Sequence, residues 1–198
     1  MFNERCAGYT AGYCQKGDFM GFDGKVLTVS AFEDFRGYLS VIYDNSLPFN
    51  FNVKQINQGY SRKKNTLRGL HFQEAPFEQA KLVTCLHGSI FNAALDIRPN
   101  SNSFGHAYGE VLSFENRKMM YIPRGYAHGY LTLEDDTLMQ WCVDNDFSGT
   151  SARAIRYDDS DIVWENGLSW LGGSSEYIIS EKDRTAMGLS EYLYAGSH

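Results

Sequence analysis

The sequence predicts an all-β protein, either a two-sheet sandwich or a barrel. Short alternating or apolar runs recur along the chain and are separated by Gly, Asn, Asp and Pro. The segments between them lack the 3.6-residue period of an amphipathic helix. Phe, Tyr and Trp make up 15% of the residues, and aromatic side chains favour strands. Together these three observations indicate many short strands packed around one core.

Each predicted strand is a short run bounded by turn-forming residues. In chain order the runs are 25–30, 38–43, 53–60, 68–73, 81–86, 90–97, 108–112, 118–122, 126–133 and 137–143. The segments 98–102 and 134–136 are rich in Pro, Asn, Ser and Asp, which favour turns. After residue 183 the pattern changes, and we expect a short helix at 187–194.

Length and composition fit one soluble globular domain of 198 residues, 43% of them hydrophobic. We expect a single domain over 1–198, with an N-terminal extension at 1–24 and a C-terminal tail at 184–198. A net charge of −6 argues against a general nucleic-acid-binding protein, which is normally basic. No stretch approaches the roughly 20 apolar residues of a membrane-spanning helix. We therefore expect neither a membrane nor a nucleic-acid partner.

The four cysteines predict neither a disulfide framework nor a metal site. Cys85 and Cys142 lie inside apolar strand-like runs, where cysteine behaves as a small buried hydrophobic side chain. Cys6 and Cys14 are too far apart for a zinc knuckle and have no matching second pair. No secretory signal precedes them, so we expect a reducing, cytoplasmic location.

Two segments carry polar groups where a packed strand would carry apolar ones. The first, 68–73, reads RGLHFQ, and in a regular strand His71 would point to the face opposite Arg68. The second, 121–129, has the spacing Pro-x-Gly-x-x-His, which places His128 at the start of a strand. A barrel whose interior is a binding cavity needs inward-facing polar side chains of this kind.

These segments and several others closely resemble the dTDP-4-dehydrorhamnose 3,5-epimerases, which are sugar-nucleotide enzymes of the cupin superfamily. The resemblance runs from Asp34 to Asp183. In chain order the matching motifs are DFRG (34–37), QIN (55–57), LRGLHFQ (67–73), QAKLV (79–83), LDIR (95–98), SFG (103–105), IPRGYAHG (122–129) and ISEKD (179–183). So many motifs in the same order are far more specific than any one of them.

The resemblance implies a cupin jelly-roll barrel with short peripheral helices. It also implies an isomerase that epimerises a nucleotide-linked 4-keto-6-deoxyhexose at C3, at C5 or at both, in deoxysugar or O-antigen biosynthesis. His71 matches the general base of the family, Asp183 the carboxylate that orients it, and Lys81 the cation that faces the C4 oxygen. The expected substrate-binding positions are Arg36, Gln55, Asn57, Arg68, His128, Gln140 and Lys182. Family members are homodimers whose sites are completed by the partner's N-terminal strands, and neither a cofactor nor a metal is implied.

The chemistry of these residue types agrees with the reaction. Removing a proton next to a ketone creates an enolate, so the site needs a base that works near neutral pH and a cation beside the oxygen. Histidine, with an ordinary pKa of about 6.5, suits the first task, and an ammonium group suits the second. The planar fork of arginine suits a diphosphate.

The chain departs from the family at the second catalytic group. Alignment through Cys142 places Gln140 where the family has a tyrosine that returns a proton to the opposite face of the sugar. Glutamine cannot deliver a proton at neutral pH. We therefore expect epimerisation at a single carbon, or slow epimerisation at both, with the proton coming from water, from Tyr130 or from His71.

Three other positions also differ from the family. Asn92 replaces an aspartate, Val41 stands where the family has a glutamate near the nucleobase, and Phe147 replaces a second tyrosine. These changes predict altered specificity. The change at Val41 leaves a CDP- or GDP-linked sugar as an alternative substrate.

Two alternative classes of function are also considered. A metal-dependent cupin normally supplies two histidines one residue apart and a glutamate, whereas His71 is followed by Phe72 and Gln73. A relative that binds sugar nucleotides without epimerising them, or that acts as a ketoisomerase, would account for the loss of the tyrosine. It would not account for a retained base, carboxylate and cation.

Overall fold

The computed structural model describes residues 13–15, 21–165, 170 and 176–195. Its strands are β1 (Tyr13–Gln15), β2 (Lys25–Val29), β3 (Phe32–Asp34), β4 (Gly37–Leu39), β5 (Gln55–Ser61), β6 (Leu67–Gln73), β7 (Lys81–His87), β8 (Ser89–Asp96), β9 (His106–Ser113), β10 (Lys118–Ile122), β11 (Tyr126–Thr132), β12 (Thr137–Val143), β13 (Ala152–Ala154) and β14 (Val163–Trp164). Its helices are α1 (Glu181–Arg184) and α2 (Leu189–Ala195).

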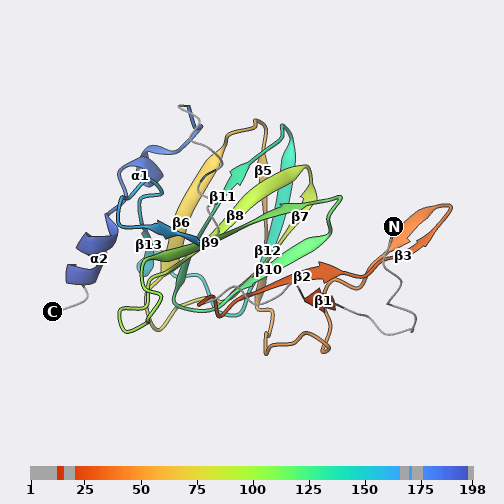
Figure 1. Ribbon diagram of the computed structural model, residues 1–198, viewed down its shortest axis with the longest axis horizontal. Coiled ribbons are helices and arrows are strands. Elements are labelled where there is room, and N and C mark those ends of the chain that lie inside the picture. Colours follow the sequence, from red (N-terminus) through yellow and green to blue (C-terminus); the bar gives the residue numbers. More distant parts are fainter. Residues whose placement is uncertain (1–12, 16–20, 166–169, 171–175, 196–198) are drawn as a thin grey trace.

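The described strands form two six-stranded sheets and a separate hairpin (Figure 1). One sheet has the order β1-β2-β10-β7-β12-β5, and the other has the order β13-β6-β11-β8-β9-β14. Strands that are neighbours in a sheet are mostly distant in the chain, so the chain crosses repeatedly between the two sheets. The predicted all-β class is confirmed.

A core between the two sheets joins side chains from both. Val83 of β7 and Met120 of β10 meet Ala94 of β8 and Leu112 of β9 there. A second core lies on the outer side of the β6–β11–β8–β9 sheet, where residues that follow β13, such as Leu189, pack over it. Because β8 is covered on both faces, all eight of its residues are buried, which is why its sequence lacks regular polar alternation.

Strand prediction fails where no core is available. The run 38–43 was expected to be one strand, but only Gly37–Leu39 forms β4, which pairs with β3. Every residue of both short strands is exposed, and the hairpin projects away from the two sheets (Figure 1). Because neither face of the hairpin is buried, the positions of its apolar residues do not show where a strand begins and ends. The predicted helix at 187–194 is confirmed as α2, two residues later than expected at its start.

A bulge between β6 and β11 decides which side chains face the interior. His128 pairs with His71 and Tyr130 pairs with Arg68. Between these two pairs β6 advances by three residues and β11 by only two, so β6 contains one extra residue. Gly69 sits in the irregular step with a φ of +113°. The expectation that Arg68 and His71 point to opposite faces is therefore wrong, because the extra residue turns both toward one cavity.

Replacing Gly69 by alanine tests how closely the backbones of β6 and β11 approach each other at the bulge. A Cβ atom there would lie 2.6 Å from the Cα of Gly129, and the positive φ would strain any L side chain. We expect Gly69→Ala to lower the free energy of unfolding by roughly 3–5 kcal/mol in urea denaturation. Gly37→Ala is the matched control, because its φ is +129° but nothing lies within 4 Å, so we expect a loss of about 1–2 kcal/mol. Equal losses would contradict the steric explanation.

Candidate active site

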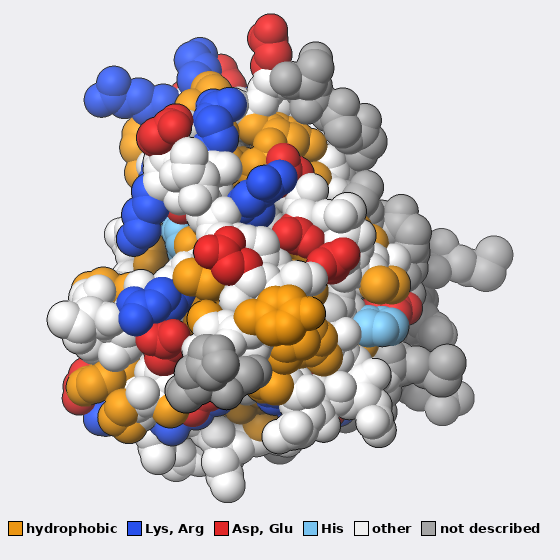
Figure 2. Space-filling view, turned by 90° about the vertical axis from the view of Figure 1, so that its left-hand side faces the viewer, with side chains coloured by type: hydrophobic (Ala, Val, Ile, Leu, Met, Phe, Trp, Pro, Cys, Tyr) orange, Lys and Arg blue, Asp and Glu red, His pale blue; other side chains and the backbone are white. Residues whose placement is uncertain are grey.

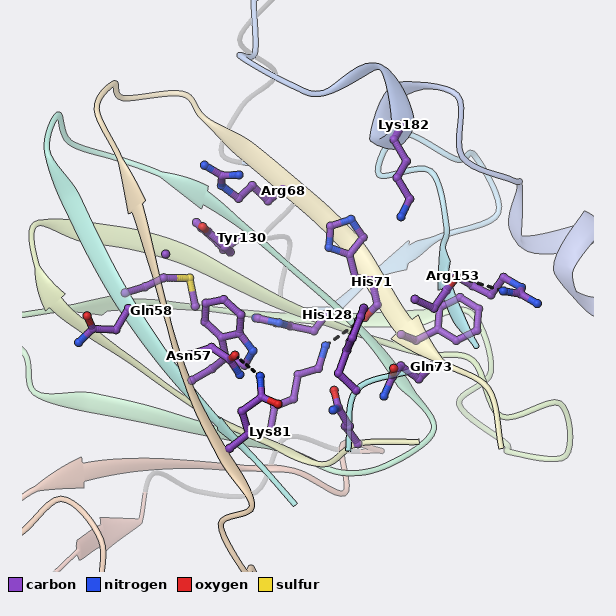
Figure 3. Close-up of a pocket in the computed structure, with 18 of the residues that line it drawn as sticks. Asn57, Gln58, Arg68, His71, Gln73, Lys81, His128, Tyr130, Arg153 and Lys182 are labelled. Atoms are coloured by element: carbon purple, nitrogen blue, oxygen red, sulfur yellow. Dashed lines mark hydrogen bonds between the residues drawn. The ribbon is translucent and has the colours of Figure 1, made fainter. Parts of the chain in front are cut away.

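A cavity of about 660 Å³ opens between the ends of the two sheets. The residues that line it come from six strands, from one helix and from the loops before β7 and β13. They are Gln55, Asn57, Gln58, Gly59, Tyr60, Arg68, His71, Phe72, Gln73, Gln79, Lys81, His128, Tyr130, Met139, Trp141, Phe147, Ala152, Arg153 and Lys182. In Figure 3, His71, His128 and Lys81 lie near one another at the centre, with Lys182 above and Arg68 to the left.

The charge of the cavity differs from that of the whole chain. Its described lining includes four cations, Arg68, Lys81, Arg153 and Lys182, and neither an aspartate nor a glutamate. The surface seen in Figure 2 is mixed, with Asp and Glu lying among the Lys and Arg side chains. Arg153 is ion-paired with Glu74 at 2.8 Å, so Arg68, Lys81 and Lys182 carry most of the positive charge of this hollow, which is suited to an anionic ligand although the net charge of the chain is −6.

His71 lies on the cavity wall with a carboxylate behind it. Its Nε2 is 2.6 Å from Oδ1 of Asp183, in an ion-pair geometry. The His71 side chain is 45% exposed, whereas that of Asp183 is only 6% exposed. One nitrogen of the ring is therefore occupied by the carboxylate, and the open edge faces the cavity. This is the arrangement of a base oriented by a buried acid.

Asp183 is positioned by the start of α1. Ser180 caps the helix by accepting a hydrogen bond from the backbone N–H of Asp183, and the backbone N–H of Gly69 donates to Oδ2 at 3.3 Å. Burial raises the pKa of Asp183, but the hydrogen bonds from His71, Gly69 and Ser180 outweigh it and leave that pKa below its ordinary value. The carboxylate therefore stays ionised beside the imidazole.

Lys81 is a buried ammonium at the inner end of the cavity. It is 8% exposed, and Nζ donates to the backbone oxygen of His71 at 3.2 Å. Burial lowers the pKa of Lys81 to about 8. Among the described residues it forms no ion pair with an aspartate or glutamate. The ammonium group of Lys81 therefore lies next to His71 without a carboxylate to neutralise it among these residues.

His128 lies beside this pair and is neutral. It is 7% exposed, and its Nε2 is 2.8 Å from Oδ1 of Asn92. Burial lowers the pKa of His128 well below its ordinary value, and the nearby Lys81 and His71 lower it further. A neutral imidazole at this depth can orient a substrate hydroxyl.

Most of the predicted site residues meet in this cavity. The structure brings together His71, Asp183, Lys81, Gln55, Asn57, Arg68, His128 and Lys182, from segments far apart in the chain. Gln140, described below, is one exception, and Arg36 is the other. Its side chain is 76% exposed and pairs with Asp34 at 2.6 Å in the projecting β3–β4 hairpin, outside the cavity of its own chain.

The assignment of Gln140 to the site is wrong. Gln140 is absent from the cavity lining, and its Oε1 accepts a hydrogen bond from Gln58 at 3.4 Å. Its neighbours Met139 and Trp141 line the cavity instead, because successive residues of a strand point to opposite faces. The alignment through Cys142 is therefore shifted by one residue relative to the side chains that face the cavity. The conclusion about chemistry survives, since neither a thioether nor an indole N–H is a proton donor at neutral pH.

Several lining residues were missed from the sequence. Arg153 lies on β13, a three-residue strand that pairs with β6, and no periodic pattern marks so short a strand. Gln73 is held by the backbone oxygens of Phe77 and Asp146. Tyr130 was noted only as a possible proton source. It lines the cavity, but its hydroxyl is buried without a hydrogen-bond partner.

The described residues contain no cluster of three or more His, Cys, Asp or Glu side chains that could hold a metal ion. No described helix is both long and apolar enough to cross a membrane. Cys85 and Cys142 are free thiols, whereas Cys6 and the side chain of Cys14 lie outside what the structure describes.

Known proteins match both the sequence and the fold. The family model described as dTDP-4-dehydrorhamnose 3,5-epimerase matches residues 22–191. The dTDP-4-dehydrorhamnose 3,5-epimerase of Escherichia coli is 38% identical over 179 residues, which cover 89% of this chain and 86% of that protein. The enzyme of the same name from Sinorhizobium fredii is 36% identical over 172 residues, covering 84% and 85% of the two chains.

Solved structures agree with the sequence relatives. The dTDP-4-dehydrorhamnose 3,5-epimerase of Elizabethkingia anophelis has a TM-score of 0.81 at 33% identity, covering 90% of this chain and 97% of that one. The dTDP-6-deoxy-D-glucose-3,5-epimerase of Legionella pneumophila, solved with dTDP-4-keto-L-rhamnose, has a TM-score of 0.76 at 30% identity, covering 84% and 88%.

The fold and the site thus define a cupin-type jelly-roll epimerase, an enzyme of the isomerase class. The chain belongs to the dTDP-4-dehydrorhamnose 3,5-epimerase family. The fold, the family and the enzyme class predicted from the sequence are confirmed. The alternative classes, a metal-dependent cupin and a relative that only binds sugar nucleotides, are not favoured.

Asp183→Asn tests the carboxylate behind His71. Because the pKa of Asp183 is below that of an unfolded chain, its ionised form stabilises the fold above about pH 4, and this contribution is lost as the pH falls. We expect the variant to be less stable by roughly 1–3 kcal/mol at pH 7, with the difference shrinking toward pH 3. Glu181→Gln, an exposed change on the same helix, is the control. A difference that stays constant with pH would refute the assignment.

Proposed function

We propose that this protein epimerises a dTDP-linked 4-keto-6-deoxyhexose, inverting C3, C5 or both by removing a proton next to the C4 ketone. One observation carries the proposal. A carboxylate-backed imidazole and a buried ammonium, His71 and Lys81, stand together at the inner end of a cavity without acidic side chains. Deprotonation next to a ketone requires a base and an oxyanion-stabilising cation in the same place.

The volume and charge of the cavity suit the nucleotide part of the substrate. A cavity of about 660 Å³ lies within the usual range of small-molecule sites. Arg68 and Lys182 line the cavity, and a guanidinium group binds a phosphate through two parallel hydrogen bonds, whereas the guanidinium of Arg153 is already paired with Glu74. The relatives described above are named for dTDP-linked sugars, which favours dTDP over CDP or GDP for this chain. Val41, the basis of that alternative, does not line the cavity of its own chain.

The wall formed by β12 and β5 bears on stereochemistry. Met139 and Trp141 supply no acid there. The phenol of Tyr60 on β5 donates to Asp136, which raises its pKa, and burial raises the pKa of Tyr130 on the neighbouring β11. A carbanion formed by His71 therefore meets no strong side-chain donor from this wall. We propose that inversion is confined to one carbon or is slow at both. The same outcome was expected from Gln140, whereas it now rests on Met139 and Trp141.

Deuterium exchange tests the proposed function. In D₂O with dTDP-4-keto-6-deoxyglucose, the wild-type protein is expected to introduce deuterium next to the ketone, as measured by NMR. His71→Asn should lower the rate by about 10²–10⁴-fold, because the base is lost. His87→Asn changes an exposed histidine outside the cavity and should leave exchange intact. Exchange that persists in His71→Asn would overturn the role of His71, and full inversion at both carbons would exclude the single-carbon proposal.

We further propose that the active protein is a homodimer in which each β3–β4 hairpin supplies Arg36 to the partner's cavity. Three features support this. The hairpin projects from the body (Figure 1), Phe35 at its tip is 98% exposed, and Leu39 is 64% exposed. Large apolar side chains left in water mark interaction surfaces. Arg36 matches a family position that binds substrate yet lies outside its own cavity.

Mixing two inactive variants tests this arrangement. Arg36→Ala and His71→Asn each damage both sites of their own homodimer. After mixing and subunit exchange, each heterodimer holds one intact site, so about a quarter of wild-type activity should return in a symmetric dimer. Analytical ultracentrifugation should show a dimer for each variant. Dimers that exchange without any recovery would contradict the shared site.

For the whole chain, we propose one catalytic domain over 1–198 that works in the cytoplasm. The free thiols of Cys85 and Cys142 suit a reducing compartment.

A further inference from the structure

A buried amide stands behind His128, where the family resemblance places a carboxylate. Asn92 of β8 is fully buried, and its Oδ1 lies 2.8 Å from Nε2 of His128. Its Nδ2 lies 3.1 Å from Sδ of Met120. The thioether is a weak acceptor, so it suits the amide N–H₂ and not the amide oxygen. Both ends of the amide are therefore fixed, with the oxygen facing the ring.

An amide oxygen and a carboxylate have different effects on the histidine. Both accept a hydrogen bond from Nε2–H, but only the carboxylate adds the negative charge that would stabilise an imidazolium. Facing Asn92, the buried ring of His128 stays neutral, with its proton on Nε2 and a lone pair on Nδ1. In this tautomer Nδ1 can only accept a hydrogen bond.

An amide at position 92 also bears on Lys81, whose charge acts on the ring of His128. The facing groups on β6 and β11 are His71, His128 and Tyr130, and none of them is a carboxylate. The nearest walls on β5 and β12 carry Asn57 and Trp141, which do not titrate.

The carboxylates near this region already have cations of their own. Asp144, which accepts from the backbone N–H of Ala80, is paired with Arg124 at 3.1 Å. Asp183 is bound to His71, as described above. Glu110 of β9, which pairs in register with Asn92, lies 2.6 Å from the ammonium of Lys118. The charge of Lys81 is therefore shared with no acidic side chain among the described residues.

We propose that Asn92 is a positioning residue that holds His128 as a neutral hydrogen-bond acceptor and leaves the Lys81 ammonium undivided for the enolate oxygen. The proposal rests on the proposed function, because it assigns Asn92 a role in the same reaction. It predicts that the substrate group beside His128 is a hydroxyl that donates to Nδ1. It also predicts that the enolate oxygen is stabilised by the Lys81 ammonium alone, and not by a network of charged side chains.

The pH dependence follows from the buried lysine. Lys81 is a cation below its pKa of about 8 and loses its charge as the pH rises through that value. Turnover should therefore fall on the alkaline side near pH 8 in the wild-type protein. A carboxylate at position 92 would stabilise the charged forms of Lys81 and His128. It would therefore move the alkaline fall to higher pH and leave His128 protonated near neutrality.

Asn92→Asp is the test, because it changes charge with almost no change in shape. We expect the alkaline fall in kcat/KM to move up by about one pH unit or more, and kcat at pH 7 to drop about tenfold as the new carboxylate shares the Lys81 charge. Asn102→Asp is the matched control, since it makes the same change of side chain at an exposed position outside the cavity lining. It should move the alkaline fall by less.

NMR of the imidazole nitrogens gives a readout that does not depend on turnover. At pH 7 the wild-type His128 should show a neutral ring protonated on Nε2, and Asn92→Asp should show an imidazolium. A charged His128 in the wild type, or a neutral ring and an unmoved alkaline fall in Asn92→Asp, would overturn the proposal. If the wild type shows no deuterium exchange, the proposed function fails, while the ring nitrogens still report whether Asn92 sets the charge.

Discussion

The hydrogen bond between His71 and Asp183 is the contact on which the whole site depends. It joins residues 112 positions apart, one from β6 and one from α1. Asp183 also accepts from the backbone of Gly69, so the same carboxylate ties the irregular step of β6 to the C-terminal helix. The base is therefore oriented by the packing of the C-terminal segment onto the sheet, and the fold of that segment and the reactivity of the ring are coupled.

The distribution of carboxylates explains how a negative protein offers a positive cavity. Acidic side chains near the site are matched to nearby cations: Asp183 to His71, Glu74 to Arg153, and Glu110 to Lys118. At the position next to His128, an amide replaces the acid. Lys81 is thus left buried without an acidic partner among the residues that the structure describes, and its pKa is lowered by burial. Such a group is of little use for stability and suits the stabilisation of developing negative charge.

Two errors in the sequence prediction have the same physical origin. A strand places alternate residues on opposite faces, so a shift of one position exchanges inside for outside. Gln140 was assigned to the site by a shift of this kind, and Trp141 is the residue that faces the cavity. Arg68 was assigned to the wrong face because the bulge opposite His128 and Tyr130 adds a residue that no local pattern reveals. Arg153 was missed because its strand has only three residues.

The sequence by itself determined the all-β class, most strand positions, the family, and the identities of the base, its carboxylate and the cation. Local patterns and ordered motifs suffice there, because alternation and residue chemistry are written along the chain. Only the tertiary structure decided which face each side chain takes, that Arg36 lies outside its own cavity, and that no acid within the described part of the chain neutralises Lys81. Those properties depend on register, bulges and contacts between distant segments, which a linear pattern does not encode.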